Sequence, residues 1–253
     1  MRRFPIPAPD PGARRVCLSV EDSRHLLQVL RMGVGATVRL YDGQGTEYDG
    51  RVEDVQEGVV RVAIAAASAS QGESPLNLIL LQGFLKEGKM DLLVRQTTEL
   101  GITQFVPVFG RRSVSRPEGR RLQVRIQRWE KIASEALKQC RRGRVPAIGP
   151  PCMLAEALRM TAACDLKIAF WEEGGLPLKQ ILAAAARPLL SAALLLGPEG
   201  GFEAAEMASA QESGFVLASL GPRILRAETA TVAACALVQY GVGDLSAPAA
   251  FKA

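Results

Sequence analysis

The first part of the chain alternates short strand-like runs with turn signals. The runs are rich in β-branched and other apolar residues, and they cover residues 15–20, 37–41, 47–55 and 59–65. Asp-Gly and Glu-Gly pairs between them favour tight turns, since glycine readily adopts positive φ. Strands at this spacing predict a small β-barrel. One helix is predicted to interrupt it at residues 21–32, with Leu26, Val29 and Leu30 on one face.

The pattern changes after a small, polar stretch at residues 66–75. This stretch reads AASASQGESP, which is typical of a linker between two domains. Beyond it, apolar runs alternate with helical periodicity, which predicts an α/β domain with a mostly parallel sheet. A helical face recurs through residues 120–140. The apolar, strand-like runs cover residues 77–83, 104–109, 166–171, 191–196 and 215–220.

Composition narrows the class of protein. No apolar run reaches the ~18 residues of a membrane span, and prolines at positions 5, 7, 9 and 11 replace the apolar core of a signal peptide. The five cysteines form no CxxC pair, which indicates reduced thiols in a cytoplasmic protein. His25 is the single histidine, so we expect neither a Ser-His-Asp triad nor a metal site.

Basic residues are concentrated in one segment. Residues 111–144 hold twelve Lys or Arg and three Glu, a net charge of +9, whereas the whole chain has a net charge of +5. A solvated helix face would explain part of this excess. The predominance of arginine, whose planar fork matches phosphate, favours contact with a nucleic acid.

Two apolar runs near the C-terminus both end in a Gly-Pro turn. They are LLLGPEGGF at residues 194–202 and SLGPRILRAETA at residues 219–230. We expect the two strand ends to lie side by side and to form a crevice lined by backbone groups, because glycine has no Cβ to block a ligand. An apolar crevice with few polar groups is typical of a small-molecule site. Its available charges are Glu199, Arg226 and Glu228.

These two turns resemble the SPOUT class of methyltransferases and, within it, the bacterial 16S ribosomal RNA uracil-N3 methyltransferases. Three further stretches extend the resemblance over nearly the whole chain. KEGKMDLLVRQTTELG at residues 86–101 resembles the family's first helix, and QCRRGRVP at 139–146 resembles its basic loop. HLLQVLRMG at residues 25–33 is similar to a motif of its N-terminal domain. The motifs in this order are strongly specific.

The resemblance implies an enzyme that uses S-adenosyl-L-methionine (SAM) to methylate N3 of a specific uridine in 16S ribosomal RNA. It implies a PUA-like RNA-binding β-barrel over residues 1–70 and a SPOUT domain over residues 76–253, with a trefoil knot at about 190–235. SPOUT sites typically borrow residues across a subunit interface, so a homodimer is expected. The implied partner is 16S rRNA or the small ribosomal subunit in the cytoplasm, with no membrane involved.

The resemblance and the chemistry of the residues together predict the site residues. The catalytic residues are Arg226 and Glu228, and no metal ligand is expected. The cofactor-binding residues belong to the two turns and the helix after them: Leu195, Leu196, Gly197, Glu199, Gly200, Leu220, Gly221, Ile224, Leu225 and Thr229. The RNA-binding residues are His25, Arg31, Lys86, Lys89, Arg141, Arg142 and Arg144. For His25 a partly buried structural role is an equal alternative.

The chemistry explains why an Arg and a Glu suit this reaction. Uracil N3 carries an imide proton that must leave before N3 attacks, and the resulting anion spreads onto O2 and O4. Arg226 fits stabilisation of that anion, because preorganised charge acts best there. Glu228 fits proton acceptance, provided that its pKa is raised or that water relays the proton. An Arg-x-Glu pair at a helix start also fits capping and a surface ion pair.

Two other functions remain open at this point. Residues 83–90, GFLKEGKM, fit the G-x-x-x-x-G-K pattern of a P-loop NTPase, but Met90 replaces the Ser or Thr that holds magnesium. The segment otherwise reads as a strand-to-helix loop. A non-catalytic ribosome- or RNA-binding protein would use the basic segment alone. Binding of SAM without RNA separates the enzyme from this last alternative.

Overall fold

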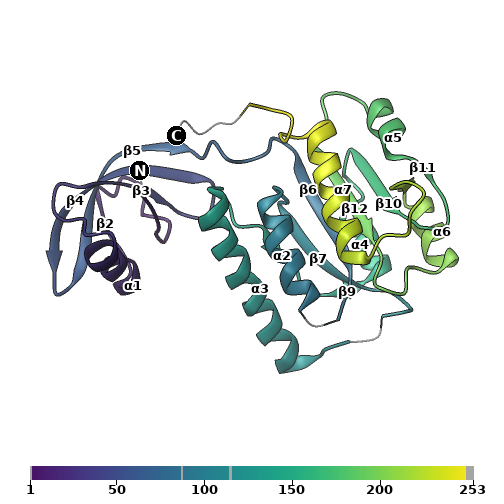
Figure 1. The fold of residues 1–253 in the computed structure, drawn as a ribbon, viewed down its shortest axis with the longest axis horizontal. Helices are drawn as coiled ribbons and strands as arrows, with labels where there is room; N and C mark the ends of the chain where they lie inside the picture. The colour runs from purple at the N-terminus through teal and green to yellow at the C-terminus, as the bar shows by residue number, and fades with distance from the viewer. Residues whose placement is uncertain (1, 87, 114–115, 249–253) are drawn as a thin grey trace. The chain divides into compact units, whose positions relative to one another are not determined.

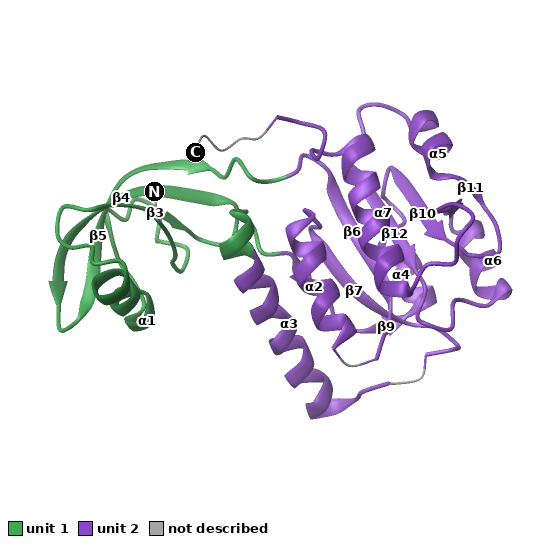
Figure 2. Ribbon diagram, in the orientation of Figure 1, with its two compact units in different colours: residues 1–73, 137–145 green, residues 74–136, 146–253 purple. Residues whose placement is uncertain are grey.

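The structure divides the chain into two compact units (Figures 1 and 2). It is a computed structural model that describes residues 2–86, 88–113 and 116–248. Unit 1 comprises residues 1–73 and 137–145, and unit 2 comprises residues 74–136 and 146–253. Unit 1 is therefore discontinuous in sequence, because it takes up a short segment from the middle of the chain.

Unit 1 is built on a five-stranded sheet in the order β1-β3-β4-β5-β2. β1 runs parallel to β3, and the other neighbours are antiparallel. The core is formed by buried apolar side chains, among them Phe4, Leu26, Val38 and Val60. The strands are β1 (Arg2–Pro5), β2 (Arg15–Cys17), β3 (Thr37–Tyr41), β4 (Thr46–Gln56) and β5 (Val59–Ala69).

The helical segment of unit 1 differs from its prediction. A short helix, α1 (Val20–Arg24), continues as a π-helical turn, η1 (His25–Val29), in which the Leu30 amide donates to the His25 carbonyl. The wider π turn changes the helical period, so the predicted face holds only in part: Leu30 packs against the core, but Val29 does not. Leu26 is therefore fully buried as predicted, whereas Val29 is 66% exposed.

The predicted linker begins too early. Strand β5 continues to Ala69, which pairs with Thr46 of β4, so residues 66–69 belong to the sheet. Small side chains gave this stretch the composition of a linker, but a strand needs only backbone partners, and β4 supplies them.

Unit 2 holds an eight-stranded sheet whose strand pairs are all parallel. Its order is β11-β13-β10-β12-β6-β7-β8, with β9 paired to β7. This confirms the predicted α/β domain. The strands are β6 (Asn77–Gly83), β7 (Gln104–Phe109), β8 (Ala147–Ile148), β9 (Cys152–Met153), β10 (Leu166–Phe170), β11 (Leu176–Pro177), β12 (Ser191–Leu196) and β13 (Val216–Ser219). The helices are α2 (Lys89–Glu99), α3 (Gly119–Cys140), α4 (Leu154–Met160), α5 (Leu178–Ala184), α6 (Ala204–Glu212) and α7 (Ala227–Val242). The last residues of α3, from 137 on, belong to unit 1.

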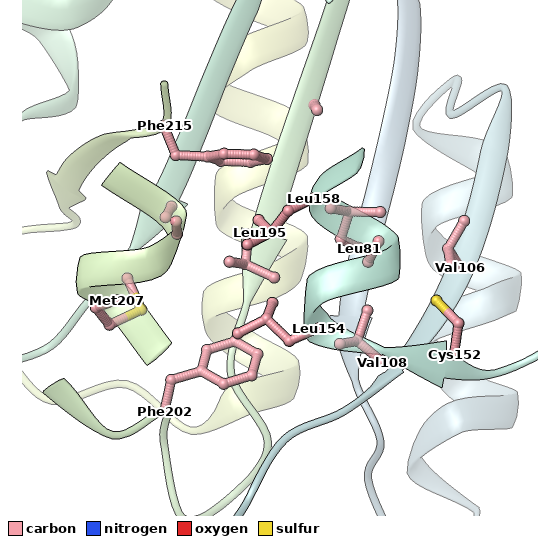
Figure 3. Packing of buried hydrophobic residues seen from close by; sticks show 14 residues of the cluster. Leu81, Val106, Val108, Cys152, Leu154, Leu158, Leu195, Phe202, Met207 and Phe215 are labelled. Carbon is pink, nitrogen blue, oxygen red and sulfur yellow. The ribbon is translucent and has the colours of Figure 1, made fainter. Parts of the chain in front are cut away.

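Helices cover both faces of this sheet. On one face, Leu81 of β6 and Leu195 of β12 pack with Leu154 and Leu158 of α4 and Met207 of α6 (Figure 3). On the other face lie α2 and α7, which contact each other (Figure 1). Alternate residues of a strand point to opposite faces of the sheet. Because helices bury both faces, the strands need apolar residues at consecutive positions. Within the described residues, no helix combines the length and apolarity needed to cross a bilayer.

Candidate functional site

A crevice lies at the carboxyl ends of three parallel strands of unit 2. β10 ends at Phe170, β12 at Leu196 and β13 at Ser219, and parallel strands place these ends at one edge of the sheet. The prediction that β12 and β13 lie side by side is wrong, because β10 pairs with both of them. The crevice therefore takes its lining from three loops instead of two.

The crevice is lined mainly by backbone and apolar groups. Its enclosed volume is about 170 Å³ and one side opens to solvent. Seven of the ten predicted cofactor residues line it: Leu196, Gly197, Glu199, Leu220, Gly221, Ile224 and Leu225. Leu195 points into the core on the α4 side, and Gly200 and Thr229 also lie outside the lining.

The third loop contributes residues that sequence reasoning missed. Trp171 and Glu172 follow β10 and line the crevice. The indole Nε1–H of Trp171 is buried and has no hydrogen-bond partner among the described residues. An aromatic residue and a carboxylate directly after a buried strand were the available signal, since ligands of parallel sheets bind outside the carboxyl ends of strands.

Two glycines shape this edge of the sheet in different ways. Gly221 has φ +103°, and a Cβ there would meet no atom within 4 Å, so its missing side chain leaves open space. Gly83 ends β6, and a Cβ there would collide with the backbone of Gly197 and Pro198. The close crossing of β6 and the loop after β12 therefore requires glycine at position 83.

A buried amide side chain ties the loop after β12 to its neighbours. Gln82 is fully buried. Its Nε2 donates to the Gly83 carbonyl at 3.0 Å and to the Gly197 carbonyl at 3.4 Å. Its Oε1 accepts a 2.6 Å hydrogen bond from the Thr231 hydroxyl. One side chain thus connects β6, the loop after β12 and helix α7.

Three charged side chains meet beside the crevice. The Lys89 Nζ lies 3.3 Å from Glu199 and 3.2 Å from Glu228. The backbone amide of Lys86 also donates to Glu199 at 3.2 Å. The ammonium thus links the loop after β12 to the first turn of α7.

The environment of Glu228 favours its charged form. A hydrogen bond from its own backbone amide, and then the nearby Lys89 and Arg226, hold the pKa of this carboxyl below its ordinary value. Hydrogen bonding to Glu228 likewise raises the pKa of the Lys89 ammonium. Glu228 therefore does not have the raised pKa that direct proton acceptance would require.

Arg226 stands at the start of α7, in the N-cap position, and is exposed. It has extended backbone geometry, with φ −63° and ψ 149°. Among the described residues it forms no ion pair, so its guanidinium is available to a ligand.

The P-loop-like segment is packed as part of the core. Phe84 and Leu85 are 2% and 1% exposed. The Leu85 amide donates to the Met90 sulfur, and the Lys86 amide donates to Glu199. The Phe84 and Lys89 amides also donate within the protein, so the described part of the segment lacks the row of free N–H groups that cradles phosphates.

The predicted basic loop belongs to unit 1. Glu73 organises it: the carboxylate accepts from the Arg142 side chain at 2.8 Å and from the backbone amides of Gly143 and Arg144 at 2.8 and 2.9 Å. Arg142 is only 3% exposed, whereas Arg141 and Arg144 are exposed. The loop therefore presents two arginines and uses the third to hold its own shape.

The other predicted RNA residues of unit 1 lie on its surface. His25 is exposed and meets the Phe4 ring edge-to-face at a centroid distance of 6.5 Å. Arg31 is exposed and has a positive φ of 52°. Lys86, in unit 2, is also exposed.

Comparisons with known proteins agree with this arrangement. An RNA methyltransferase domain family matches residues 72–239, and an RNA methyltransferase PUA domain family matches residues 18–64. The chain is 30% identical over 239 residues to a ribosomal RNA small subunit methyltransferase E of Mycobacterium bovis, which covers 92% of this chain and 88% of that protein. It is 29% identical to one of Buchnera aphidicola, covering 90% and 88%. The crystal structure of such an enzyme from Neisseria gonorrhoeae, bound to S-adenosyl methionine, superposes with a TM-score of 0.84 at 31% identity, covering 97% of this chain and 99% of that one.

Proposed function

Because this chain belongs to the ribosomal RNA small subunit methyltransferase E family, we propose that it uses SAM to methylate N3 of a uridine in 16S rRNA. The observation that carries the proposal is the backbone-lined crevice at the ends of β10, β12 and β13, with Arg226 and Glu228 following in the same loop and helix. Mass spectrometry of 16S rRNA from a strain without this gene tests it. Loss of one N3-methyluridine is the expected result, and an unchanged modification pattern contradicts it.

Three features of the crevice fit SAM. The buried Trp171 Nε1–H has no hydrogen-bond partner among the described residues. A buried donor without a partner costs free energy, and an acceptor atom of a bound ligand would remove that cost. The open space beside Gly221 lets a ligand reach the main chain. The apolar side chains of Leu196, Leu220 and Leu225 suit an adenine ring. When bound, SAM supplies the methyl group for transfer.

The residues of the chain would then prepare the uridine. We propose that the free guanidinium of Arg226 stabilises the anion left when N3 loses its proton. The backbone amide of Glu228, and then Lys89, keep the pKa of the Glu228 carboxyl below its ordinary value, and Lys89 pairs with it. We therefore propose that the N3 proton passes through water to this carboxylate or to solvent. Placement of N3 in line with the methyl group is a task of orientation.

Binding and assembly complete the proposal. Arg141 and Arg144 of the loop, with His25 and Arg31, are proposed to dock the RNA on unit 1, and Arg142 is proposed to position the loop. The proposed state is a cytoplasmic homodimer with a trefoil knot at about residues 190–235, as in the SPOUT class. Size-exclusion chromatography with light scattering tests the dimer.

Replacing Gly221 with valine is expected to weaken SAM binding at least tenfold, because the side chain enters the crevice. Isothermal titration calorimetry without RNA measures this. Gly58→Val is the matched control: Gly58 also has positive φ, at +79°, and open space around it, but it lies in the β4–β5 turn. Equal affinity in the two variants would place the cofactor elsewhere. Because RNA is absent from the assay, SAM binding by the wild type also excludes a protein that binds only RNA.

Replacing Arg226 with lysine is expected to slow methyl transfer about 10–100-fold while changing RNA affinity little, because the charge remains but the planar fork is lost. Single-turnover rates at saturating RNA and SAM test this. The variant's rate should recover partly between about pH 7 and about pH 9, since the deprotonated imide is the nucleophile. Arg159→Lys, at an exposed site on α4, is the control. A variant that loses only RNA affinity would make Arg226 a docking residue.

A further inference from the structure

A second hollow of unit 2, separate from the cofactor crevice, is lined by four arginines. The first turn of α2 forms one wall and the first half of α3 forms the other, around a volume of about 740 Å³. We call it the α2–α3 groove. Its arginines are Arg120, Arg121, Arg125 and Arg128.

The sequence of α3 explains why the arginines share this groove. With 3.6 residues per turn, positions 121, 125 and 128 fall on one side of a helix. Trp129 anchors the helix: it is 2% exposed, and its Nε1 donates to Asp91 of α2 at 3.0 Å. This hydrogen bond fixes the helix backbone that carries the arginines beside the first turn of α2.

The charge of the groove is only partly neutralised from within. Arg128 pairs with Asp91 at 2.7 Å, and the Arg125 guanidinium lies 5.9 Å from the centre of the Phe84 ring. Arg120 and Arg121 are exposed and form no ion pair within the part of the chain that the structure describes. Four arginines against one lining carboxylate fit a ligand with several negative charges at regular spacing.

The groove lies next to the proposed catalytic cluster along the chain. It reaches Gly88, and the next residue, Lys89, pairs with Glu199 and Glu228. A chain molecule whose reacting unit lies at Glu228 would thus find the groove along its path. Among polyanions, RNA matches both the charge and this continuity.

We propose that the α2–α3 groove binds the sugar-phosphate backbone of the rRNA strand next to the methylated uridine, an inference that rests on the proposed function. Arg120 and Arg121 bind phosphates there through their planar forks. The contact adds to that of the basic loop in unit 1 and serves affinity and register, with no part in the chemistry.

The test is a comparison of two double variants that remove the same charge. Arg120→Gln/Arg121→Gln changes the two unpaired groove arginines, and Arg95→Gln/Arg159→Gln changes two exposed arginines elsewhere in unit 2. Affinity for deproteinised small-subunit rRNA is measured over a series of salt concentrations. The groove variant should lose affinity about tenfold at low salt, and the slope of log K against log salt should fall by about 1.4, or about 0.7 for each lost single-strand contact. The control should keep the wild-type slope, and both variants should keep wild-type SAM affinity.

Three results would overturn the groove assignment. The first is an equal loss of affinity in the groove variant and the control, and the second is an unchanged salt slope. The third is a loss of binding to the intact small subunit but not to naked rRNA, which would indicate an acidic ribosomal protein as the partner. The proposed function fails separately: in that case wild-type protein binds no SAM, whatever its affinity for RNA.

Discussion

Replacing Gly83 with alanine is expected to lower the melting temperature by roughly 6–12 °C and to weaken SAM binding in the same protein. A Cβ at this position collides with the main chain of Gly197 and Pro198. Main chain cannot rotate away as a flexible side chain can, so the cost should reach about 3 kcal/mol, the upper part of the range for overpacking. For a chain of this size each kcal/mol lowers the melting temperature by about 2–4 °C. The displaced loop carries Glu199 and lines the crevice, which is why affinity falls with stability.

Gly174→Ala is the matched control for Gly83→Ala. Gly174 lies in the same unit, and a Cβ there meets nothing within 4 Å. Scanning calorimetry and SAM titration are run on both variants. If Gly83→Ala behaves like Gly174→Ala in both measurements, β6 and the loop after β12 do not cross as closely as the structure shows.

Replacing Glu73 with alanine is expected to destabilise unit 1 by about 3 kcal/mol, because it leaves the buried guanidinium of Arg142 without its carboxylate. The variant also removes the carboxylate that accepts hydrogen bonds from the backbone amides of Gly143 and Arg144. Hydrogen exchange should therefore accelerate at these two amides. RNA affinity should fall as well, since the loop that presents Arg141 and Arg144 loses its support.

The double variant Glu73→Ala/Arg142→Met supplies the control. It removes the buried guanidinium together with its carboxylate, so it should regain most of the stability that Glu73→Ala loses. The two freed amides should stay fast in hydrogen exchange, because methionine offers them no acceptor. Slow exchange at Gly143 and Arg144 in Glu73→Ala would mean that Glu73 does not hold the loop.

Local pattern was sufficient for most elements of unit 2. Apolar runs followed by a glycine gave the bounds of β7 and β12, and the run that ends in Gly83 gave those of β6, all as the structure has them. Strand β1 was not predicted because Arg2–Pro5 has two charges and a proline. Its strand conformation depends on backbone pairing with β3, which composition does not reveal. The π turn at His25–Val29 likewise has no signal in a period of 3.6 residues.

The site was predictable in its chemistry and less so in its neighbours. Glycine-rich turns identified the loops after β12 and β13, but no local signal shows that β10 lies between these two strands in the sheet. The pairing of Glu73 with Arg142 joins residues 69 positions apart, and such a contact depends on how the whole unit folds. The charge count therefore identified the basic segment, but it did not show that Arg142 pairs with a carboxylate of the protein itself.

The discontinuity of unit 1 limits how this protein can be taken apart or recombined. A fragment ending at residue 73 would lack residues 137–145, and Glu73 would face solvent with neither Arg142 nor the loop amides to bind. The N-terminal residues alone therefore do not make up the whole of unit 1. Grafting it onto another catalytic domain would require transplanting the end of α3 and the loop after it, because that segment completes the unit.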